Sequence, residues 1–195
     1  MFEKLNEIDT QALLFLNSFH NDWLDEVMFL ISIDKIWIPF YLIIIIFLFK
    51  IFNRKKALLI VTCLVCVVAL SDRISSGFFK PTFKRYRPTH EHAIMEKIYT
   101  VHDYRGGDYG FISSHAANTF GLAMFLFLTL HKKFKNIRWL FLWAGVVSYS
   151  RIYLGVHYPL DILTGALLGV LLALIFYQIY LKCVQNIFKE DQINF

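Results

Sequence analysis

The sequence predicts an all-α fold: a polytopic membrane helix bundle with about five transmembrane helices and an N-terminal interfacial helix. Hydrophobic residues make up 57% of the 195 residues and charged residues only 18%, and the mean hydropathy is +0.50. Soluble domains lie nearer ~45–50% apolar and about 25% charged. The apolar residues gather in long runs, and the 20 Phe, 10 Tyr and 4 Trp suit lipid-facing surfaces and interfacial belts.

The first predicted element is an amphipathic helix over residues 7–19. Its apolar residues recur at helical spacing among polar ones, at Ile8, Ala12, Phe15, Leu16 and Phe19. This pattern favours a helix lying on the membrane surface, with a poorly ordered leader as the alternative.

The transmembrane helices are predicted over residues 24–52, 57–79, 114–131, 136–153 and 158–182 of a single domain, 1–195. Roughly 20 helical residues cross ~30 Å of hydrocarbon, so several apolar runs must borrow their flanks. The first helix then places Asp34 and Lys35 near an interface, and Pro81 kinks the second. The long connection, residues 83–112, contains Gly106, Gly107 and Gly110, which indicate a flexible loop.

Basic residues predict the orientation of the bundle. They flank two connections and occur in the tail, at Lys50, Arg54, Lys55, Lys56, Lys132, Lys133, Lys135, Arg138, Lys182 and Lys189. Alternating helices bring these segments to one side, which the positive-inside rule makes cytoplasmic, so the 83–112 connection faces outward.

The net charge of +5 does not indicate a nucleic-acid partner, because the basic residues lie between apolar runs or within motifs. Cys63 and Cys66 form a C-x-x-C inside an apolar run, where packing is a better interpretation than redox or zinc chemistry.

Three polar clusters interrupt the apolar chain, and alternating helices bring all three to the outward side. Lys80 and Arg87 are seven residues apart, so they share a helix face if the helix persists past Pro81. Ser113-Ser114-His115 precedes an apolar run, where a serine caps the helix and free N–H groups bind anions.

The third cluster is Ser150-Arg151-x5-His157-x3-Asp161. His157 and Asp161 are i,i+4 near a helix start, so their side chains can meet. Each cluster alone has a plainer interpretation: head-group contacts, a helix cap, or a structural hydrogen bond. Together, on one side of a membrane where ionisable residues are costly, they predict a phosphate site.

The three segments KPTFKRYRP, ISSH and SRIYLGVHYPLD resemble the signature of the type 2 phosphatidic acid phosphatase family, which vanadium-dependent haloperoxidases share. The haloperoxidases are soluble, unlike this apolar chain. The central motif departs from the P-S-G-H of the family at Ile112 and Ser114, which bears on loop conformation and substrate fit.

The resemblance implies a role for each motif residue, with no metal and no cofactor. Lys80, Arg87, Arg151, Ser113 and the backbone N–H of Ser114 hold the phosphoryl oxygens. His157 attacks phosphorus to give a phosphohistidine, and Asp161 accepts from its other ring nitrogen. His115 protonates the leaving oxygen and then activates water.

The resemblance also implies a substrate class, a lipid phosphate, and a bacterial inner-membrane location with the site facing the periplasm or cell exterior. Undecaprenyl diphosphate is the preferred substrate. Lipid A, phosphatidylglycerophosphate and phosphatidate are the alternatives, and a non-catalytic lipid-binding relative is an alternative of another class.

The outward loop also contains histidines and acids that would allow a metal site, although a solvated loop is the favoured interpretation. These residues are His90, His92, His102, Glu91, Glu96 and Asp103.

Overall fold

The computed structural model describes the backbone of residues 2–193 and the side chains of residues 3–186. Within this range every regular element is a helix, and the extended backbone forms only an isolated bridge between Tyr86 and Tyr109. The all-α prediction is therefore confirmed. The α-helices are α1 (Phe2–Asn17), α2 (Asp22–Ile31), α3 (Ile38–Ile51), α4 (Arg54–Ile74), α5 (Lys80–Phe83), α6 (Ser114–Leu130), α7 (Trp139–Tyr153) and α8 (Pro159–Ile193).

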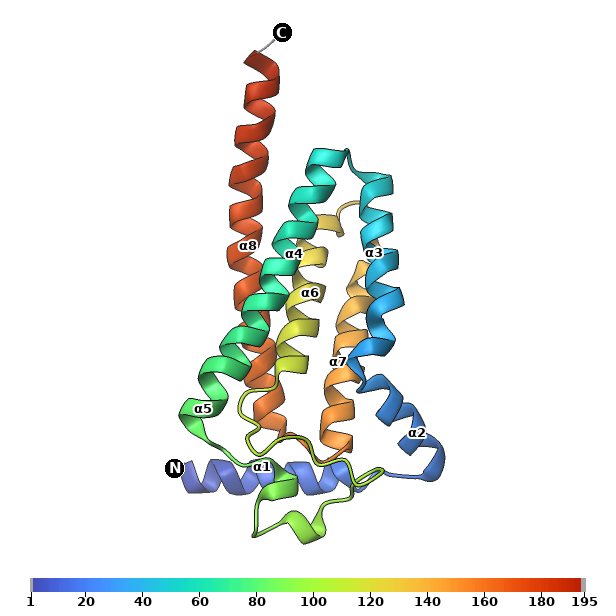
Figure 1. Ribbon diagram of the computed structural model, residues 1–195, viewed down its shortest axis with the longest axis vertical. Helices are drawn as coiled ribbons and strands as arrows, with labels where there is room; N and C mark the ends of the chain where they lie inside the picture. The colour runs from blue at the N-terminus through green and yellow to red at the C-terminus, as the bar shows by residue number, and fades with distance from the viewer. Residues whose placement is uncertain (1, 194–195) are drawn as a thin grey trace.

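Helix α1 lies across one end of the bundle, roughly perpendicular to the long helices (Figure 1). It begins and ends earlier than the predicted 7–19. Its buried positions are Asp9, Leu13 and Asn17, one helical turn apart, whereas Ile8 and Phe15 are exposed. The face that packs on the bundle therefore carries two polar side chains beside Leu13, whereas Ile8 and Phe15 point away from the bundle.

The predicted continuous helix over residues 24–52 is wrong. The segment is broken into α2, a 3₁₀ turn (Asp34–Trp37) and α3, with a bend of 69° between the two arms. Asp34 and Lys35 stand at the break, and Pro39 lies in the first turn of α3, where its missing N–H is tolerated.

Helix α4 continues through a π turn (Ser75–Phe79) into α5 and ends at Lys84, whose φ of 47° is left-handed. The wide turn lies directly before Pro81, where the proline ring disrupts the regular hydrogen-bond ladder. Because the helix ends there, Lys80 and Arg87 do not share a helix face, and Arg87 lies in the loop.

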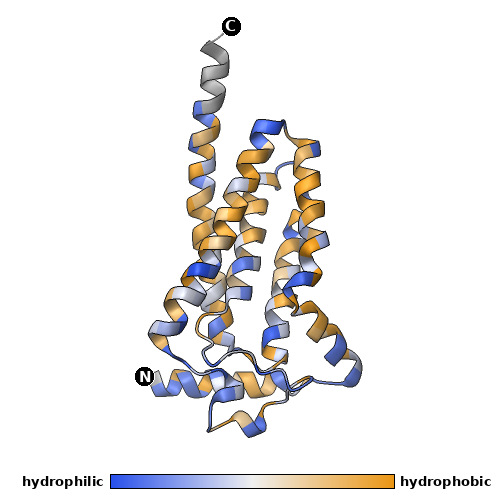
Figure 2. Ribbon diagram, viewed as in Figure 1, coloured by the Kyte–Doolittle hydropathy of each residue, from blue (hydrophilic) through white to orange (hydrophobic). Residues whose placement is uncertain are grey.

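Two described segments are long and apolar enough to cross a membrane, Arg54–Phe83 and Pro159–Asn186, and the bent pair of α2 and α3 gives a third if counted as one span. Helices α6 and α7 have 17 and 15 residues. Apolar residues dominate the long helices (Figure 2), and several exposed ones face outward, among them Leu42, Ile43, Leu58, Val65 and Leu167. Such a surface is suited to lipid.

Helix α6 lies at the centre of the bundle and packs very closely on α8. An added Cβ at Gly169 would lie 2.1 Å from the carbonyl oxygen of Ala117, and one at Gly165 would lie 2.4 Å from that of Ser113. Only glycine fits at these positions, as at other close contacts between membrane helices. The contact brings the start of α6, with the second motif, against the start of α8, with the third.

Candidate active site

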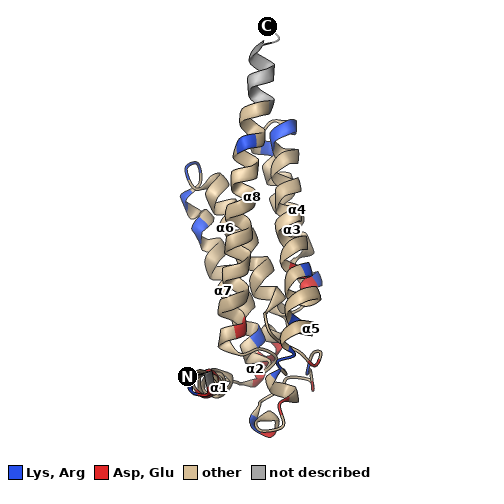
Figure 3. Cartoon of the chain, turned by 90° about the vertical axis from the view of Figure 1, so that its left-hand side faces the viewer, with Lys and Arg blue, Asp and Glu red and all other residues tan. Residues whose placement is uncertain are grey.

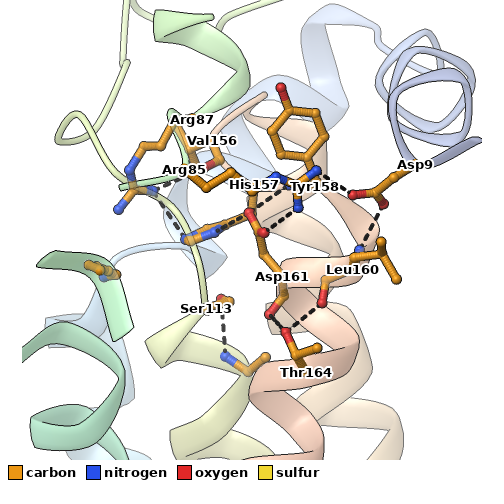
Figure 4. A network of polar contacts seen from close by, with 12 residues as sticks. Asp9, Arg85, Arg87, Ser113, Val156, His157, Tyr158, Leu160, Asp161 and Thr164 are labelled. Atoms are coloured by element: carbon orange, nitrogen blue, oxygen red, sulfur yellow. Dashed lines mark hydrogen bonds and ion pairs between the residues drawn. The ribbon is translucent and has the colours of Figure 1, made fainter. Parts of the chain in front are cut away.

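The three sequence clusters meet at the end of the bundle that α1 covers (Figure 4). Nη1 of Arg87 lies 3.1 Å from Nε2 of His157, which joins the first cluster to the third. The N–H of Ser113 donates to the carbonyl oxygen of Asp161 over 3.0 Å, which joins the second to the third. The predicted convergence on one side of the bundle is therefore present in the fold.

His157 lies in the short connection between α7 and α8 and is 1% exposed. Its Nδ1 is 3.3 Å from Oδ2 of Asp161, one helical turn further on. Because an arginine can only donate, Nε2 must accept from Arg87, so the ring proton sits on Nδ1 and points to Asp161. This tautomer leaves a lone pair on Nε2. The contacts at the two ring nitrogens fix the orientation of the imidazole.

The charge state of His157 follows from its surroundings. Burial lowers the pKa of His157 well below 6.5, and the charges of Arg87, Arg151, Lys80 and His115 lower it further. The imidazole is therefore neutral at neutral pH, which a nitrogen nucleophile requires. Charged side chains from all three motifs therefore act on this one ring.

The two motif arginines form a desolvated cationic pair beside His157. Arg87 and Arg151 are 7% and 3% exposed. Arg87 donates to the carbonyl oxygen of Val156 over 3.0 Å, and Arg151 donates to Oγ of Ser32 and, over 3.0 Å, to the hydroxyl of Tyr104. Burial, followed by repulsion from Arg151, lowers the pKa of Arg87 to about 10, so Arg87 remains charged at neutral pH.

Each of these arginines keeps a buried Nε–H that has no hydrogen-bond partner among the described residues. Buried donors are nearly always paired, and leaving a charged one unpaired is costly. A tetrahedral oxyanion is the ligand that such a pair of guanidinium groups recognises best. The site is therefore built to take an anion.

His115 lies in the first turn of α6, and its Nε2 contacts the break between α2 and α3. It is 3.1 Å from Oδ1 of Asp34 and 3.2 Å from the carbonyl oxygen of Ser32. These two contacts hold the His115 ring at Nε2, against the break between the two helices.

A pocket of about 460 Å³ extends from His115 into the bundle between α3, α4, α6 and α7. Its polar end holds Asp34, His115 and Asn118, and the rest is mainly apolar: Trp37, Tyr41, Ile44, Ile45, Val61, Leu64, Val65, Val68, Ala69, Leu122 and Val147. The polar site thus adjoins apolar space inside the bundle.

Two of the other predicted phosphate ligands, Ser113 and Lys80, have local partners. Oγ of Ser113 caps α6 by accepting from the N–H of Ala116 over 3.4 Å, as expected for a serine at a helix start. Ser114 begins α6, and Nζ of Lys80 lies 3.4 Å from Oγ of Ser76. Direct contacts of these three residues with phosphate stay a prediction.

Sequence reasoning missed Arg85, Asp9 and Gly110. Arg85 stands two residues before Arg87 but outside the motif positions, and it donates to Oδ1 of Asp161 over 2.8 Å. Gly110 was assigned to a flexible loop, but an added Cβ there would lie 3.1 Å from Oδ2 of Asp161. In the sequence, Gly110 is marked only by lying three residues before the second motif. A glycine in that place can serve as a flexible hinge or allow a close contact, and the sequence does not distinguish the two.

Two histidines of the 83–112 connection, His90 and His102, lie beside different acidic residues. His90 lies 3.8 Å from Asp108 and His102 lies 3.0 Å from Glu26. Among the described residues no group of three or more His, Cys, Asp or Glu side chains could hold a metal ion.

The fold and the site together define a helical membrane protein with a neutral histidine held between a carboxylate and a buried arginine, beside a second buried arginine. The model of the PAP2 superfamily matches residues 58–185, and the chain belongs to this family.

Three relatives show how the family is represented. A lipid A 4'-phosphatase of Bacteroides thetaiotaomicron is 41% identical over 99% of this chain and 86% of the relative. A lipid A 4'-phosphatase of Porphyromonas gingivalis is 38% identical over 92% of this chain and 75% of the relative. An undecaprenyl-diphosphatase of Sulfolobus acidocaldarius is 31% identical over 70% of this chain and 59% of the relative.

Two crystal structures share the fold. A PAP2-type phosphatidylglycerolphosphate phosphatase from Bacillus subtilis superposes with a TM-score of 0.69 at 22% identity, over 92% of this chain and 87% of the other. LpxE of Aquifex aeolicus gives 0.62 at 24% identity, over 87% of this chain and 94% of the other.

Proposed function

We propose that this protein is a membrane lipid phosphatase that removes the 4'-phosphate of lipid A through a phosphohistidine on His157. The observation that carries the proposal is the neutral His157, which is held between Asp161 and Arg87 and also feels the charge of the buried Arg151. The Nε–H of each arginine has no hydrogen-bond partner within the described part of the chain. The choice of lipid A rests on the lipid A 4'-phosphatase relatives, which match nearly the whole chain at 41% and 38% identity.

This choice corrects the preference for undecaprenyl diphosphate. The undecaprenyl-diphosphatase relative is more distant and aligns with a smaller share of both chains. The motifs alone could not separate the two substrates, because they encode the phosphate chemistry and not the lipid that carries it.

In the first step, the lone pair on Nε2 of His157 forms a bond to phosphorus as the bond from phosphorus to the lipid oxygen breaks. Arg87 and Arg151 bind the phosphoryl oxygens, with Lys80 and Ser113 as further ligands. The positive charge that develops on the imidazole is stabilised by Asp161 through the Nδ1–H. His115, protonated, gives its proton to the lipid oxygen, which leaves as a hydroxyl.

In the second step, the neutral His115 takes a proton from water as the water oxygen attacks phosphorus. The bond from phosphorus to Nε2 breaks, inorganic phosphate leaves, and both histidines return to their starting states. Positioned cations supply the charge stabilisation in both steps, so the mechanism needs no metal ion.

The pocket beside His115 supports a lipid substrate. It adjoins the general acid at its polar end and is otherwise lined mainly by apolar side chains of the bundle. A hydrocarbon chain in this space would hold the leaving oxygen beside His115, which would have to come away from Asp34 to reach it.

We further propose five transmembrane helices in the bacterial inner membrane, with α1 on the membrane surface and the site facing the periplasm or cell exterior. The two basic connections lie together, since Nζ of Lys56 and Nζ of Lys133 are 5.2 and 5.1 Å from the ring centroid of Phe52. This basic end is opposite α1 and the site (Figure 3), as the positive-inside rule requires for an outward-facing site.

Phosphate release by the purified protein in detergent tests the function. The substrates are lipid A with its 4'-phosphate, undecaprenyl diphosphate, phosphatidylglycerophosphate and phosphatidate, and mass spectrometry identifies the product. We expect lipid A to lose one phosphate at the highest kcat/KM. Faster turnover of undecaprenyl diphosphate would overturn the substrate, and binding without release from any of the four would favour the non-catalytic relative.

A further inference from the structure

Arg85 is the link between α1 and the candidate catalytic pair. Its Nη1 donates to Oδ1 of Asp161 over 2.8 Å, and its Nη2 donates to Oδ2 of Asp9 over 2.7 Å. The guanidinium carbon lies 3.9 Å from the ring centroid of Tyr158, which covers one face. A planar group held at both nitrogens and on one face has little freedom to turn.

Asp9 is in turn fixed by the bundle. Its Oδ1 accepts from the backbone N–H of Leu160 over 2.9 Å, in the first turn of α8, and its side chain is 1% exposed. Asp9 therefore binds both Arg85 and the helix start that carries Asp161. If Asp9 served packing alone, an apolar residue would serve better, because burying a carboxylate is costly.

The two oxygens of Asp161 have separate partners. Oδ2 faces Nδ1 of His157 at 3.3 Å and accepts from the N–H of Tyr158 over 3.1 Å, whereas Oδ1 accepts from the side chain of Arg85. The side chain of Asp161 is 0% exposed. A carboxylate so fully buried stays ionised only if a cation and hydrogen bonds compensate it.

We propose that Arg85 and Asp9 are positioning residues of the proposed phosphatase: they hold Asp161 ionised and oriented so that it accepts the Nδ1 proton of His157. The proposal rests on the proposed function. It gives α1 a part in catalysis, because the helix supplies the carboxylate that keeps the Arg85 guanidinium in place.

Arg85 is not a phosphate ligand by this geometry. Both of its Nη atoms bind carboxylates, and Asp9 approaches from α1 on the opposite side of His157 from Arg87 (Figure 4). Losing Arg85 should therefore lower kcat and leave KM nearly unchanged, whereas losing a phosphate ligand should also raise KM.

The experiment measures kcat and KM for lipid A dephosphorylation by Arg85→Gln, Arg85→Lys, Asp9→Asn and the Asp9→Asn/Arg85→Gln double variant. The matched controls are Lys97→Gln, an exposed cation of the same outward loop, and Glu7→Gln, an exposed acid of the same helix. Unfolding temperatures in detergent are recorded for every variant, so that misfolded protein is recognised.

We expect Arg85→Gln to lower kcat roughly 10- to 100-fold, the effect typical of removing a group that orients a functional ligand, with KM within about threefold. Arg85→Lys should recover part of the loss, since one cation can still reach Asp161. Asp9→Asn should lose less than Arg85→Gln, and the double variant should be no worse than Arg85→Gln alone, because both changes break one chain of contacts.

A kcat for folded Arg85→Gln within twofold of the wild type would overturn the proposal, and so would a loss expressed only in KM. If Arg85→Gln does not fold, the test uses Arg85→Lys and Asp9→Asn. A kcat within twofold of the wild type in both folded variants, or a loss expressed only in KM, would then overturn the proposal. A wild-type protein that is inactive on every lipid phosphate refutes the proposed function instead, and an active one with insensitive variants refutes only the positioning role.

Discussion

Gly110 offers the most direct steric test of the site, because a single methyl group there meets three of its residues. An added Cβ would lie 3.1 Å from Oδ2 of Asp161, 3.2 Å from Cγ of Arg87 and 3.5 Å from Nδ1 of His157. The backbone N–H of Gly110, which donates to the carbonyl oxygen of Arg85 over 2.9 Å, would be kept in alanine. Gly110→Ala therefore perturbs position without removing any polar group.

The size of the effect can be worked from these distances. Ordinary contact begins at 3.4 Å, so Asp161 must move away by about 0.3 Å. If a misplacement of ~1 Å lowers the rate ~100-fold, then ~0.3 Å lowers it about fourfold on the same logarithmic scale. Overpacking should also destabilise the fold by about 1 kcal/mol.

The assay is kcat for phosphate release at saturating lipid substrate, with unfolding temperature measured in parallel. Gly107→Ala is the matched control, because an added Cβ there meets nothing within 4 Å. We expect about a fourfold lower kcat for Gly110→Ala and an unchanged kcat for Gly107→Ala. Equal activity of Gly110→Ala and wild type would refute the reasoning, and equal losses in both would show that loop flexibility matters instead.

The other predictions concern the nucleophile, its charge, the metal and the helix contact. His157→Ala should abolish turnover while leaving the unfolding temperature within a few degrees; substantial activity would falsify the nucleophile assignment. Since burial and then Arg87 lower the pKa of His157, the acidic limb of kcat/KM that His157 sets should lie below pH 6.5, and Arg87→Gln should move that limb to higher pH; an unmoved limb would contradict this account. Activity should survive dialysis against a strong chelator, and restoration by added divalent cation would show that a metal takes part. Gly169→Ala should destabilise by about 1–3 kcal/mol in thermal unfolding, whereas Gly145→Ala, which meets nothing within 4 Å, should not.

Sequence spacing predicted those contacts of the site that form between residues close together in the chain. The i,i+4 pair of His157 and Asp161 and the cap by Ser113 are local features, so helix geometry was enough to predict both contacts. The three-motif signature predicted that Arg87 joins them, although Arg87 reaches His157 from a loop and not from a helix face.

Contacts across long sequence separations left no comparable signal. Arg85 and Asp9 are 76 residues apart, and neither belongs to a periodic pattern that marks it as buried and paired. Hydropathy separated spanning from non-spanning segments only approximately, because α6 and α7 are short and α8 extends well past its predicted end. The substrate was the least predictable feature, since the catalytic motifs leave the lipid unspecified.

The break between α2 and α3 is where the helix predicted from hydropathy differs most clearly from the structure. It lies beside the candidate site, where a backbone carbonyl group contacts a site residue. An unbroken helix would use the carbonyl oxygen of Ser32 for its own ladder; the break frees it to contact His115, while the Ser32 hydroxyl binds Arg151 and the Asp34 carboxylate pairs with His115. Irregular backbone near membrane depth is stable only where protein or a cavity covers it, and here the pocket and the site do so. Local preference for one long helix therefore yields to contacts that hold His115, the proposed general acid, and Arg151, a proposed phosphate ligand. Departures of this kind are expected where a fold builds its function.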